Sequence, residues 1–322
     1  MARKIPKIVK EIRKNPPSPV NYAFQKNVSY SQMNIFRSCP HRWKLQYKDK
    51  IKRFTSSIHT VFGTAIHEAM QEYLAVMYET SATKADLLNL EANFQNYFIT
   101  EYNKQYKSNT SKHFSSALQM REFYEDGIAI LNWFKKKRSK YFTTRGWHLV
   151  GCEIPLVIAP DKMRNNILYA GFLDVVMYNE KTEMFKIIDL KTSTRGWRDQ
   201  DKKNEDKQFQ LLLYKKFFSE QYNIPLDKIE IEFFILKRKV LDWDDDNIKS
   251  PHQAYRVQTF SPPSGRIKLG RANKAITDFI NECFNNGGEI KDITYPKSPS
   301  KWNCNFCPYK EDAKLCGEGV KF

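Results

Sequence analysis

The chain has 322 residues, with 53 Lys or Arg against 36 Asp or Glu, and a formal net charge of +17 at pH 7. Its hydrophobic content of 41% and its 12 glycines indicate a folded chain with a buried core, which excludes disorder as the main state. No apolar run reaches the ~18 residues of a membrane span, and no signal-peptide pattern follows the basic start, so we expect a protein of the cytoplasm with no membrane partner.

The first half of the chain is predicted to be mainly helical. Residues 1–28 are basic and contain three prolines close together, so we expect a flexible or docked arm rather than a helix throughout. In residues 29–145, a helical segment capped by Ser31 is interrupted near Pro40. Apolar residues then recur at helical spacing in 63–78, 87–106 and 115–141.

The pattern changes in residues 146–290, which we expect to form an α/β core. Short runs rich in Val, Ile, Leu and aromatic residues predict strands at 147–158, 167–178, 184–192, 229–240 and 255–260. Helical patterns occupy 205–222 and 266–284. A central sheet flanked by helices follows from this order. The chain contains no Gly-x4-Gly-Lys phosphate loop, which argues against a nucleotide-driven motor.

Six cysteines are too few for a disulfide scaffold, but their spacing indicates a metal site. Residues 291–322 contain Cys-x2-Cys-x8-Cys, formed by Cys304, Cys307 and Cys316. Thiolates are ligands for zinc or for an iron–sulfur cluster, and either needs about four of them. Cys39 is the best fourth candidate, because Cys152 falls in a predicted strand and Cys283 in a predicted helix. The C-terminal segment would then pack back on the N-terminal part.

Two isolated carboxylates in neighbouring apolar strands predict a site for a hard cation. Asp189 and Lys191 share one face of a strand, because side chains alternate with a period of 2, and Asp174 lies in the preceding strand. Asp174, Asp189 and the backbone carbonyl of Leu190 provide the oxygen donors that Mg²⁺ or Mn²⁺ prefers. Lys191 would stabilise the negative charge of a reacting phosphate. An Asp–Lys ion pair at a sheet edge is the structural alternative.

Four further residues extend this candidate site. His67 on a predicted helix would suit Mn²⁺, although an ordinary histidine is the alternative. Gln210 and Tyr214 are four residues apart, hence on one helix face, where they could orient Lys191 or a phosphate. Glu153, on the first strand, is a candidate additional metal ligand.

The order of these motifs resembles a known nuclease family. It consists of Ser-x-Ser followed by Cys39-Pro40, Gly-x3-His, Glu153, Gly-x2-Asp, Asp-x-Lys, Gln-x3-Tyr and the cysteine motif, over residues 29–316. This set resembles the RecB-type branch of the PD-(D/E)xK nucleases. Within that branch it is most similar to members with an iron–sulfur cluster: CRISPR adaptation exonucleases, the AddB nuclease domain and stand-alone phage nucleases.

The resemblance implies a mixed sheet with flanking helices, as in restriction endonucleases, and assigns roles to the candidate residues. His67, Asp174 and Asp189 would bind the metal. Lys191 would take part in activating the hydrolysis, and Gln210 and Tyr214 would support these catalytic groups. The resemblance also favours a [4Fe-4S] cluster over structural Zn²⁺ at Cys39, Cys304, Cys307 and Cys316. In this chain the third acidic position is Asp189 rather than Glu, and there is no helicase half, so a free end or a single strand is the expected substrate.

Basic and aromatic residues offer candidate contacts to DNA. The net positive charge favours a nucleic-acid partner, with solubility as the alternative. The basic candidates follow one another in a helical stretch: Lys135, Lys136, Lys137, Arg138 and Lys140. Trp197 and Arg198, beyond the active strand, could grip the substrate, or the tryptophan could pack in its loop. Asp242 and residues 244–246 are acidic and predict a solvated turn.

These residues predict a metal-dependent deoxyribonuclease, an exonuclease on single-stranded or frayed DNA ends. It would act in recombination or repair, alongside a recombination or replication protein, and a phage-encoded enzyme in the host cytoplasm would fit. The alternative is a catalytically inactive nuclease-fold protein that binds or scaffolds DNA. The presence of every catalytic residue type favours the enzyme.

Overall fold

The structure, a computed structural model, describes residues 4–17, 26–160, 166–241 and 253–317. The chain divides into two compact units. Unit 1 comprises residues 1–16, 56–155 and 172–263, and unit 2 comprises residues 17–55, 156–171 and 264–322. Each unit therefore combines segments that are far apart in the sequence, whereas the sequence patterns predict consecutive segments.

Helices form most of unit 1. They are α1 (Lys7–Lys14), α4 (Ile58–Glu79), α5 (Ala82–Asp86), α6 (Leu90–Ser108), α7 (Ala117–Lys137), α8 (Asp199–Lys203) and α9 (Glu205–Tyr222), with 3₁₀ turns η3 (Arg138–Lys140) and η4 (Leu226–Lys228). The helices of unit 2 are α2 (Tyr30–Ser38), α3 (Pro40–Trp43), the π-helical turn η2 (Lys44–Lys48), α10 (Arg266–Cys283) and α11 (Lys301–Asn305).

The strands form a mixed sheet. They are β1 (Lys26–Val28), β2 (Trp147–Ile158), β3 (Ile167–Asn179), β4 (Met184–Ser193), β5 (Ile229–Lys237) and β6 (Val257–Phe260). In unit 1, β4 is antiparallel to β3 and parallel to β5, and β6 is antiparallel to β5. In unit 2, β1 is parallel to the first residues of β3. Strand β2 also pairs with β3. The prediction of a mixed central sheet flanked by helices is confirmed.

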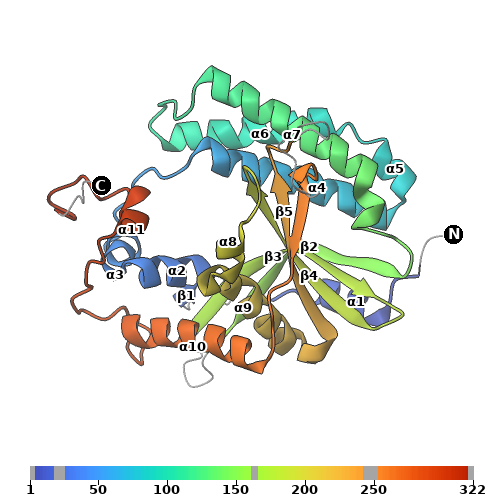
Figure 1. Cartoon of the computed structure of the whole chain (residues 1–322). Coiled ribbons are helices and arrows are strands. Elements are labelled where there is room, and N and C mark those ends of the chain that lie inside the picture. The colour runs from blue at the N-terminus through green and yellow to red at the C-terminus, as the bar shows by residue number, and fades with distance from the viewer. Residues whose placement is uncertain (1–3, 18–25, 161–165, 242–252, 318–322) are drawn as a thin grey trace. The chain divides into compact units, whose positions relative to one another are not determined.

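Alternation along β4 separates two environments in unit 1. Ile188 and Leu190 belong to a hydrophobic core with side chains of α4, α6 and α7, which Figure 1 shows grouped together with α5. On the other face, the ring of Phe185 lies 5.6 Å from that of Phe218 on α9. Helix α9 therefore covers the face of β4 that carries the residues at odd positions, which include Asp189.

Unit 2 has an aromatic centre of its own. The ring of Trp43 is 5.5 Å from that of Phe279 on α10 and 5.5 Å from that of Tyr295. Phe36 of α2 lies 5.2 Å from Phe279. The helical segment that contains Phe36 and Trp43 is interrupted at Cys39, whose backbone is extended, and Pro40 begins α3. Proline is well suited to this first helical position because its missing N–H would have no helical partner there.

One local prediction needs correction. Ser29, rather than Ser31, caps α2, because its side chain accepts a hydrogen bond from the backbone N–H of Gln32 at 3.2 Å. In the N-terminal arm, which we expected to be flexible or docked, residues 7–14 form the helix α1. Val9 and Ile12 of this helix are buried, so its apolar face is docked. Elsewhere the predicted bounds of β2 and α9 are confirmed to the residue.

No helix among the described residues has the length and apolar character needed to cross a membrane.

Candidate active site

Two carboxylates and an ammonium group meet on the strands of unit 1. Asp189 and Lys191 project from one face of β4, and the Nζ of Lys191 lies 2.8 Å from Oδ2 of Asp189. Asp174 comes from β3, and its Oδ2 accepts a hydrogen bond of 2.7 Å from the backbone N–H of Leu190. This bond joins Asp174 directly to the segment between the two β4 residues. The period of 2 and the antiparallel pairing thus bring all three side chains to one place.

Asp189 is buried with unsatisfied oxygen atoms. Its side chain is 1% exposed, and neither carboxylate oxygen makes a hydrogen bond of good geometry within the described part of the chain, although Lys191 forms the ion pair at Oδ2. A buried carboxylate with free lone pairs is costly unless a cation approaches it. The donor chemistry at this position therefore fits a hard metal ion.

Burial controls the protonation of both carboxylates. It raises the pKa of Asp189 to about 6, against the opposing effect of Lys191, and the negative charge of Asp174 adds to the increase. Burial likewise raises the pKa of Asp174 to about 6, while Lys191 and the Leu190 N–H act in the other direction. At pH 7 both groups are therefore ionised only in part of the molecules or at a free-energy cost, and a bound cation would favour the ionised form.

Lys191 is a cation at neutral pH. Burial lowers its pKa, but the carboxylates of Asp189 and Asp174 outweigh this effect, so the pKa lies above its ordinary value. The ammonium is therefore available to stabilise negative charge rather than to act as a base.

Helix α4 contributes an imidazole. His67 Nδ1 lies 3.8 Å from Oδ2 of Asp174, and the imidazole also interacts with the backbone of Leu190. Burial, followed by the Lys191 charge, lowers the pKa of His67 to about 4, so the imidazole is neutral at pH 7. A neutral imidazole keeps the lone pair that metal ligation needs.

Gln71 is a residue of the site that the sequence patterns did not reveal. It lies four residues after His67, on the same face of α4. Its amide donates to Oε1 of Glu153 at 2.7 Å and to the backbone carbonyl of Asp174 at 3.0 Å. The spacing of four residues from a candidate ligand is the signal that could have identified it.

Glu153 has an unusual backbone for a strand residue. Its φ is 52°, in the left-handed region that is uncommon outside glycine. Conformations of this kind cost on the order of 1–3 kcal/mol and are concentrated at functional sites. Its charge raises the pKa values of Asp174 and His67, so the carboxylate lies near both.

Helix α9 supplies the remaining polar pair. Gln210 donates from its amide to the phenolic oxygen of Tyr214 at 3.1 Å. Burial raises the pKa of Tyr214, and the charge of Asp189 raises it further, so the phenol stays protonated beside the carboxylates. The structure thus brings together His67, Glu153, Asp174, Asp189, Leu190, Lys191, Gln210 and Tyr214.

The described side chains do not form a closed metal cage. Among the residues that the structure describes, no group of three or more His, Cys, Asp or Glu side chains is arranged to hold a metal ion. An ion such as Mg²⁺ is often held by one or two carboxylates together with waters and substrate phosphates, and an open arrangement suits that mode.

The four predicted cluster cysteines all lie in unit 2, on segments that hydrogen bonds hold together. Burial raises the pKa of the Cys307 thiol, and the nearby Cys316 and Cys39 contribute to the increase. The Asn303 amide, beside Cys304, donates to the carbonyl of Ser38 at 2.7 Å, and His41 Nε2 lies 2.8 Å from the Leu315 carbonyl. Cys39 is thereby close to the C-terminal cysteines.

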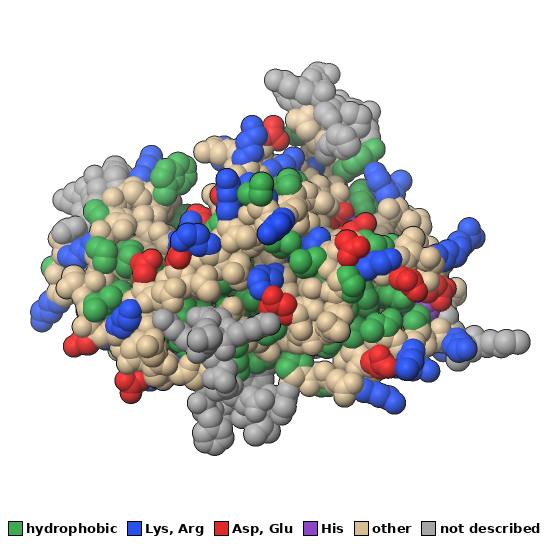
Figure 2. Space-filling model, turned by 90° about the horizontal axis from the view of Figure 1, so that it is seen from below, with side chains coloured by type: hydrophobic (Ala, Val, Ile, Leu, Met, Phe, Trp, Pro, Cys, Tyr) green, Lys and Arg blue, Asp and Glu red, His purple; other side chains and the backbone are tan. Residues whose placement is uncertain are grey.

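The predicted DNA contacts have mixed surroundings. Arg138 pairs with Asp86 at 2.9 Å, while Lys136, Lys137 and Lys140 are exposed and Lys135 is half-buried. On the face drawn in Figure 2, Lys and Arg side chains are interspersed with Asp and Glu rather than gathered in one block. Local arrangement, rather than net charge, must therefore decide where an anion binds.

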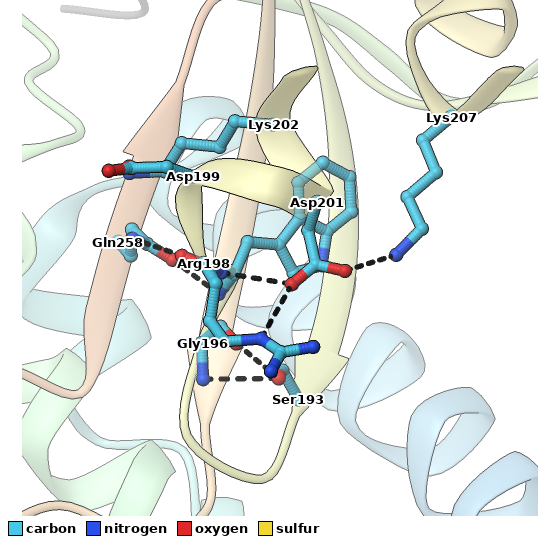
Figure 3. A network of polar contacts seen from close by, with 9 residues as sticks. Ser193, Gly196, Arg198, Asp199, Asp201, Lys202, Lys207 and Gln258 are labelled. Carbon is cyan, nitrogen blue, oxygen red and sulfur yellow. Dashed lines mark hydrogen bonds and ion pairs between the residues drawn. The ribbon is translucent and has the colours of Figure 1, made fainter. Parts of the chain in front are cut away.

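Trp197 and Arg198 belong to the loop between β4 and α8. The Trp197 ring packs 4.7 Å from the ring of Phe233, which agrees with the alternative of a packed loop tryptophan. The backbone N–H of Arg198 donates to Oδ2 of Asp201 at 3.0 Å, and the Arg198 side chain lies 3.6 Å from the same carboxylate, as Figure 3 shows. Arg198 thus takes part in starting α8.

Comparison with known proteins agrees with this geometry. Residues 27–311 match the PD-(D/E)XK nuclease superfamily, a range that includes every candidate active-site residue. No curated protein matches the chain significantly. With most of its length matched and the carboxylates and lysine placed together on adjacent strands, the chain belongs to the PD-(D/E)XK nuclease superfamily.

Proposed function

We propose that the protein is a metal-dependent deoxyribonuclease that degrades DNA from single-stranded or frayed ends. The observation that carries this proposal is the pair of carboxylates formed by buried Asp189 and half-buried Asp174, with the Nζ of Lys191 2.8 Å from Oδ2 of Asp189. Such a pair repels itself unless it binds a cation, and phosphodiester hydrolysis is the chemistry that superfamily membership supports.

The chain's own donors fit the ion that this reaction needs. Asp174, Asp189 and neutral His67 would hold it, with the Leu190 carbonyl and Glu153 as further donors. Bound Mg²⁺ or Mn²⁺ would supply polarisation of a phosphoryl oxygen and a lowered pKa for a bound water.

The remaining residues of the site would orient the substrate phosphate and stabilise its developing charge. Lys191, which stays protonated, would stabilise the negative charge that develops on the attacked phosphate. Gln210 and Tyr214 would position the phosphate or Lys191 through their amide and phenol. Because Asp189 is nearly inaccessible to solvent, these charges act in a medium of low dielectric, where they are stronger than in water.

Degradation of end-labelled DNA tests this function. We expect the purified protein with Mn²⁺ or Mg²⁺ to shorten single strands labelled at the 5′ or 3′ end. Addition of EDTA should stop this cleavage. Circular single strands and blunt duplexes serve as controls, since an exonuclease on free single-stranded ends should degrade neither. If no DNA is cleaved with either metal, the protein is instead a nuclease-fold binding or scaffolding protein.

We further propose that Cys39, Cys304, Cys307 and Cys316 hold a [4Fe-4S] cluster, with structural Zn²⁺ as the alternative. The proximity of Cys39 and Cys316 to Cys307 supports this proposal, as do the hydrogen bonds that join their segments. Such a cluster would stabilise unit 2 by joining its first and last segments, and would take no part in bond breaking.

Loss of the cluster is expected when one ligand is replaced. Anaerobically purified wild-type protein should be brown and contain iron and acid-labile sulfide, whereas Cys307→Ser should lose both and melt at a lower temperature. Cys152→Ser is the matched control, because that thiol lies in unit 1 and contacts the Gln71 carbonyl at 4.0 Å. A colourless wild-type protein with stoichiometric zinc would exclude iron.

The cellular setting follows from the proposed activity. We propose that the protein acts in the cytoplasm on DNA that undergoes recombination or repair, alongside a recombination or replication protein. Its net charge of +17 supports a polyanionic substrate.

A further inference from the structure

A large basic cavity opens in unit 1, beyond the ends of β4 and β5. Its volume is about 1140 Å³, above the usual range for small-molecule sites. The described residues that line it include five basic side chains and no acidic one. These basic residues are Lys140, Arg195, Lys202, Lys237 and Lys239. The composition of the lining favours an anionic occupant.

The cavity continues the line of the active site. Asp189 pairs with Phe233 in the parallel register of β4 and β5, and Ser193 pairs with Lys237. Lys237 therefore lies four residues further along, on the same face of the sheet, about 13 Å at 3.3 Å per residue. One strand of DNA covers that distance with roughly four nucleotides at 3.4 Å each.

The carboxylates of the described residues are unevenly distributed over these cations. Lys239 lies 3.0 Å from Glu122 and 3.1 Å from Asp126, while the ion pair that the described residues give Lys202 is a distant one, at 3.6 Å from the exposed Asp199. Arg195 is exposed and makes no ion pair with any described residue. The acidic residues of 242–246, predicted as a solvated turn, lie outside the described residues.

Lys237 places a basic group on the wall of the cavity. Its side chain is 5% exposed, and burial followed by the Arg256 guanidinium lowers its pKa.

Aromatic rings lie next to the basic side chains of the cavity. Tyr141 and Tyr255 both line the cavity, and the Nζ of Lys140 lies 4.4 Å from the centre of the Tyr255 ring. A combination of basic groups and aromatic faces is typical of sites for unpaired nucleic acid, because bases that are not paired stack on the rings.

The loop after β4 is held by polar contacts, some of which involve Gln258 of the cavity lining (Figure 3). The Gln258 side chain accepts from the Trp197 N–H at 2.7 Å and donates to its carbonyl at 3.1 Å. Gly196 has φ of 94°, and a Cβ there would lie 3.0 Å from Cδ of Lys237. The absence of a side chain at Gly196 thus leaves room for Lys237, and the wall is largely preformed.

We propose that this cavity binds an unpaired stretch of the DNA substrate next to the phosphate that is cleaved. Arg195, Lys202 and Lys237 contact the phosphates, and Tyr255 stacks on a base. The inference rests on the proposed nuclease function and adds to it a separate site that holds the strand.

The double variant Arg195→Ala/Lys202→Ala tests this inference, because neither side chain is part of the core. Binding of a long fluorescent single strand in EDTA should weaken roughly 10- to 30-fold near 0.1 M salt, and the slope of log K against log[salt] should fall by about 1.4. With Mn²⁺, KM for the long strand should rise while kcat and the hydrolysis of bis(p-nitrophenyl) phosphate, which is too small to reach the cavity, stay unchanged. Lys107→Ala/Lys112→Ala is the control, since it removes the same charge from exposed positions outside the cavity.

Each outcome separates this inference from the proposed function. Wild-type binding and salt slope in Arg195→Ala/Lys202→Ala would overturn the inference even if the enzyme cleaves DNA. Conversely, a wild-type protein that binds single strands through these residues but cleaves nothing would refute the nuclease and support the cavity. An equal loss of duplex binding, or displacement of the strand by a free nucleotide at equal concentration, would also overturn the inference.

Discussion

Replacement of Asp189 by alanine should abolish cleavage of DNA. We expect kcat/KM to fall by at least about 10³-fold, which corresponds to about 4 kcal/mol of transition-state stabilisation. The physical reason is that Asp189 provides buried oxygen atoms that, apart from the ion pair with Lys191, have no hydrogen-bond partner among the described residues. Binding of single-stranded DNA in EDTA should remain within a few fold of wild type, since Asp189 is nearly inaccessible and repels phosphate.

The matched control is Asp292→Ala. The Asp292 side chain is fully exposed, and its one ion pair among the described residues is with Lys48 at 2.7 Å, a surface pair that contributes little to stability. Its cleavage rate should equal that of wild type. Metal-dependent cleavage that persists in highly purified Asp189→Ala protein would place the active site elsewhere.

Replacement of Lys191 by alanine should have the second-largest effect. We expect kcat to fall about 10²- to 10³-fold, the usual result of removing one group that stabilises transition-state charge. KM should change little, because the ammonium is paired with Asp189 in the free protein and also interacts with the charge of Asp174. Single-turnover cleavage of a labelled strand measures the effect without interference from product release.

Lys186→Ala provides a control on the same strand. Lys186 pairs with Glu232 at 2.8 Å, so this variant removes a paired lysine from β4 without touching the carboxylate cluster. It should cleave DNA at the wild-type rate. If Lys191→Ala also retained full activity, the ion pair with Asp189 would be structural, which is the alternative that the sequence left open.

The strand residues of the candidate site could be predicted because side chains along a strand alternate strictly between the two faces of the sheet. Asp189 and Lys191 had to share a face if residues 184–192 formed a strand, and β4 places Ile188 and Leu190 in the opposite core. The position of Gln71 is different, since its partners Glu153 and Asp174 lie on separate strands. Spacing within α4 reveals which residues share a face, but not which strand that face meets.

Local capping and loop packing were also harder to predict. Ser29 and Ser31 are both good N-cap residues, and only the path of the backbone selects Ser29. From the sequence, Trp197 could have faced the substrate or the core. Its ring packs against that of Phe233, a contact between distant residues that the sequence pattern does not reveal. The boundaries of the two units depend on contacts between distant segments, which hydrophobic periodicity does not encode.

The discontinuous make-up of unit 2 affects its folding during synthesis. Residues 17–55 belong to this unit, but the segment from residue 264 onward that completes it emerges more than 200 residues later. At 5–20 residues per second, the early segment waits on the order of ten seconds or more beside the ribosome. Helix α2 and the apolar side chains around Trp43 are exposed in that interval, so we expect nascent chains that stall before residue 264 to recruit chaperones.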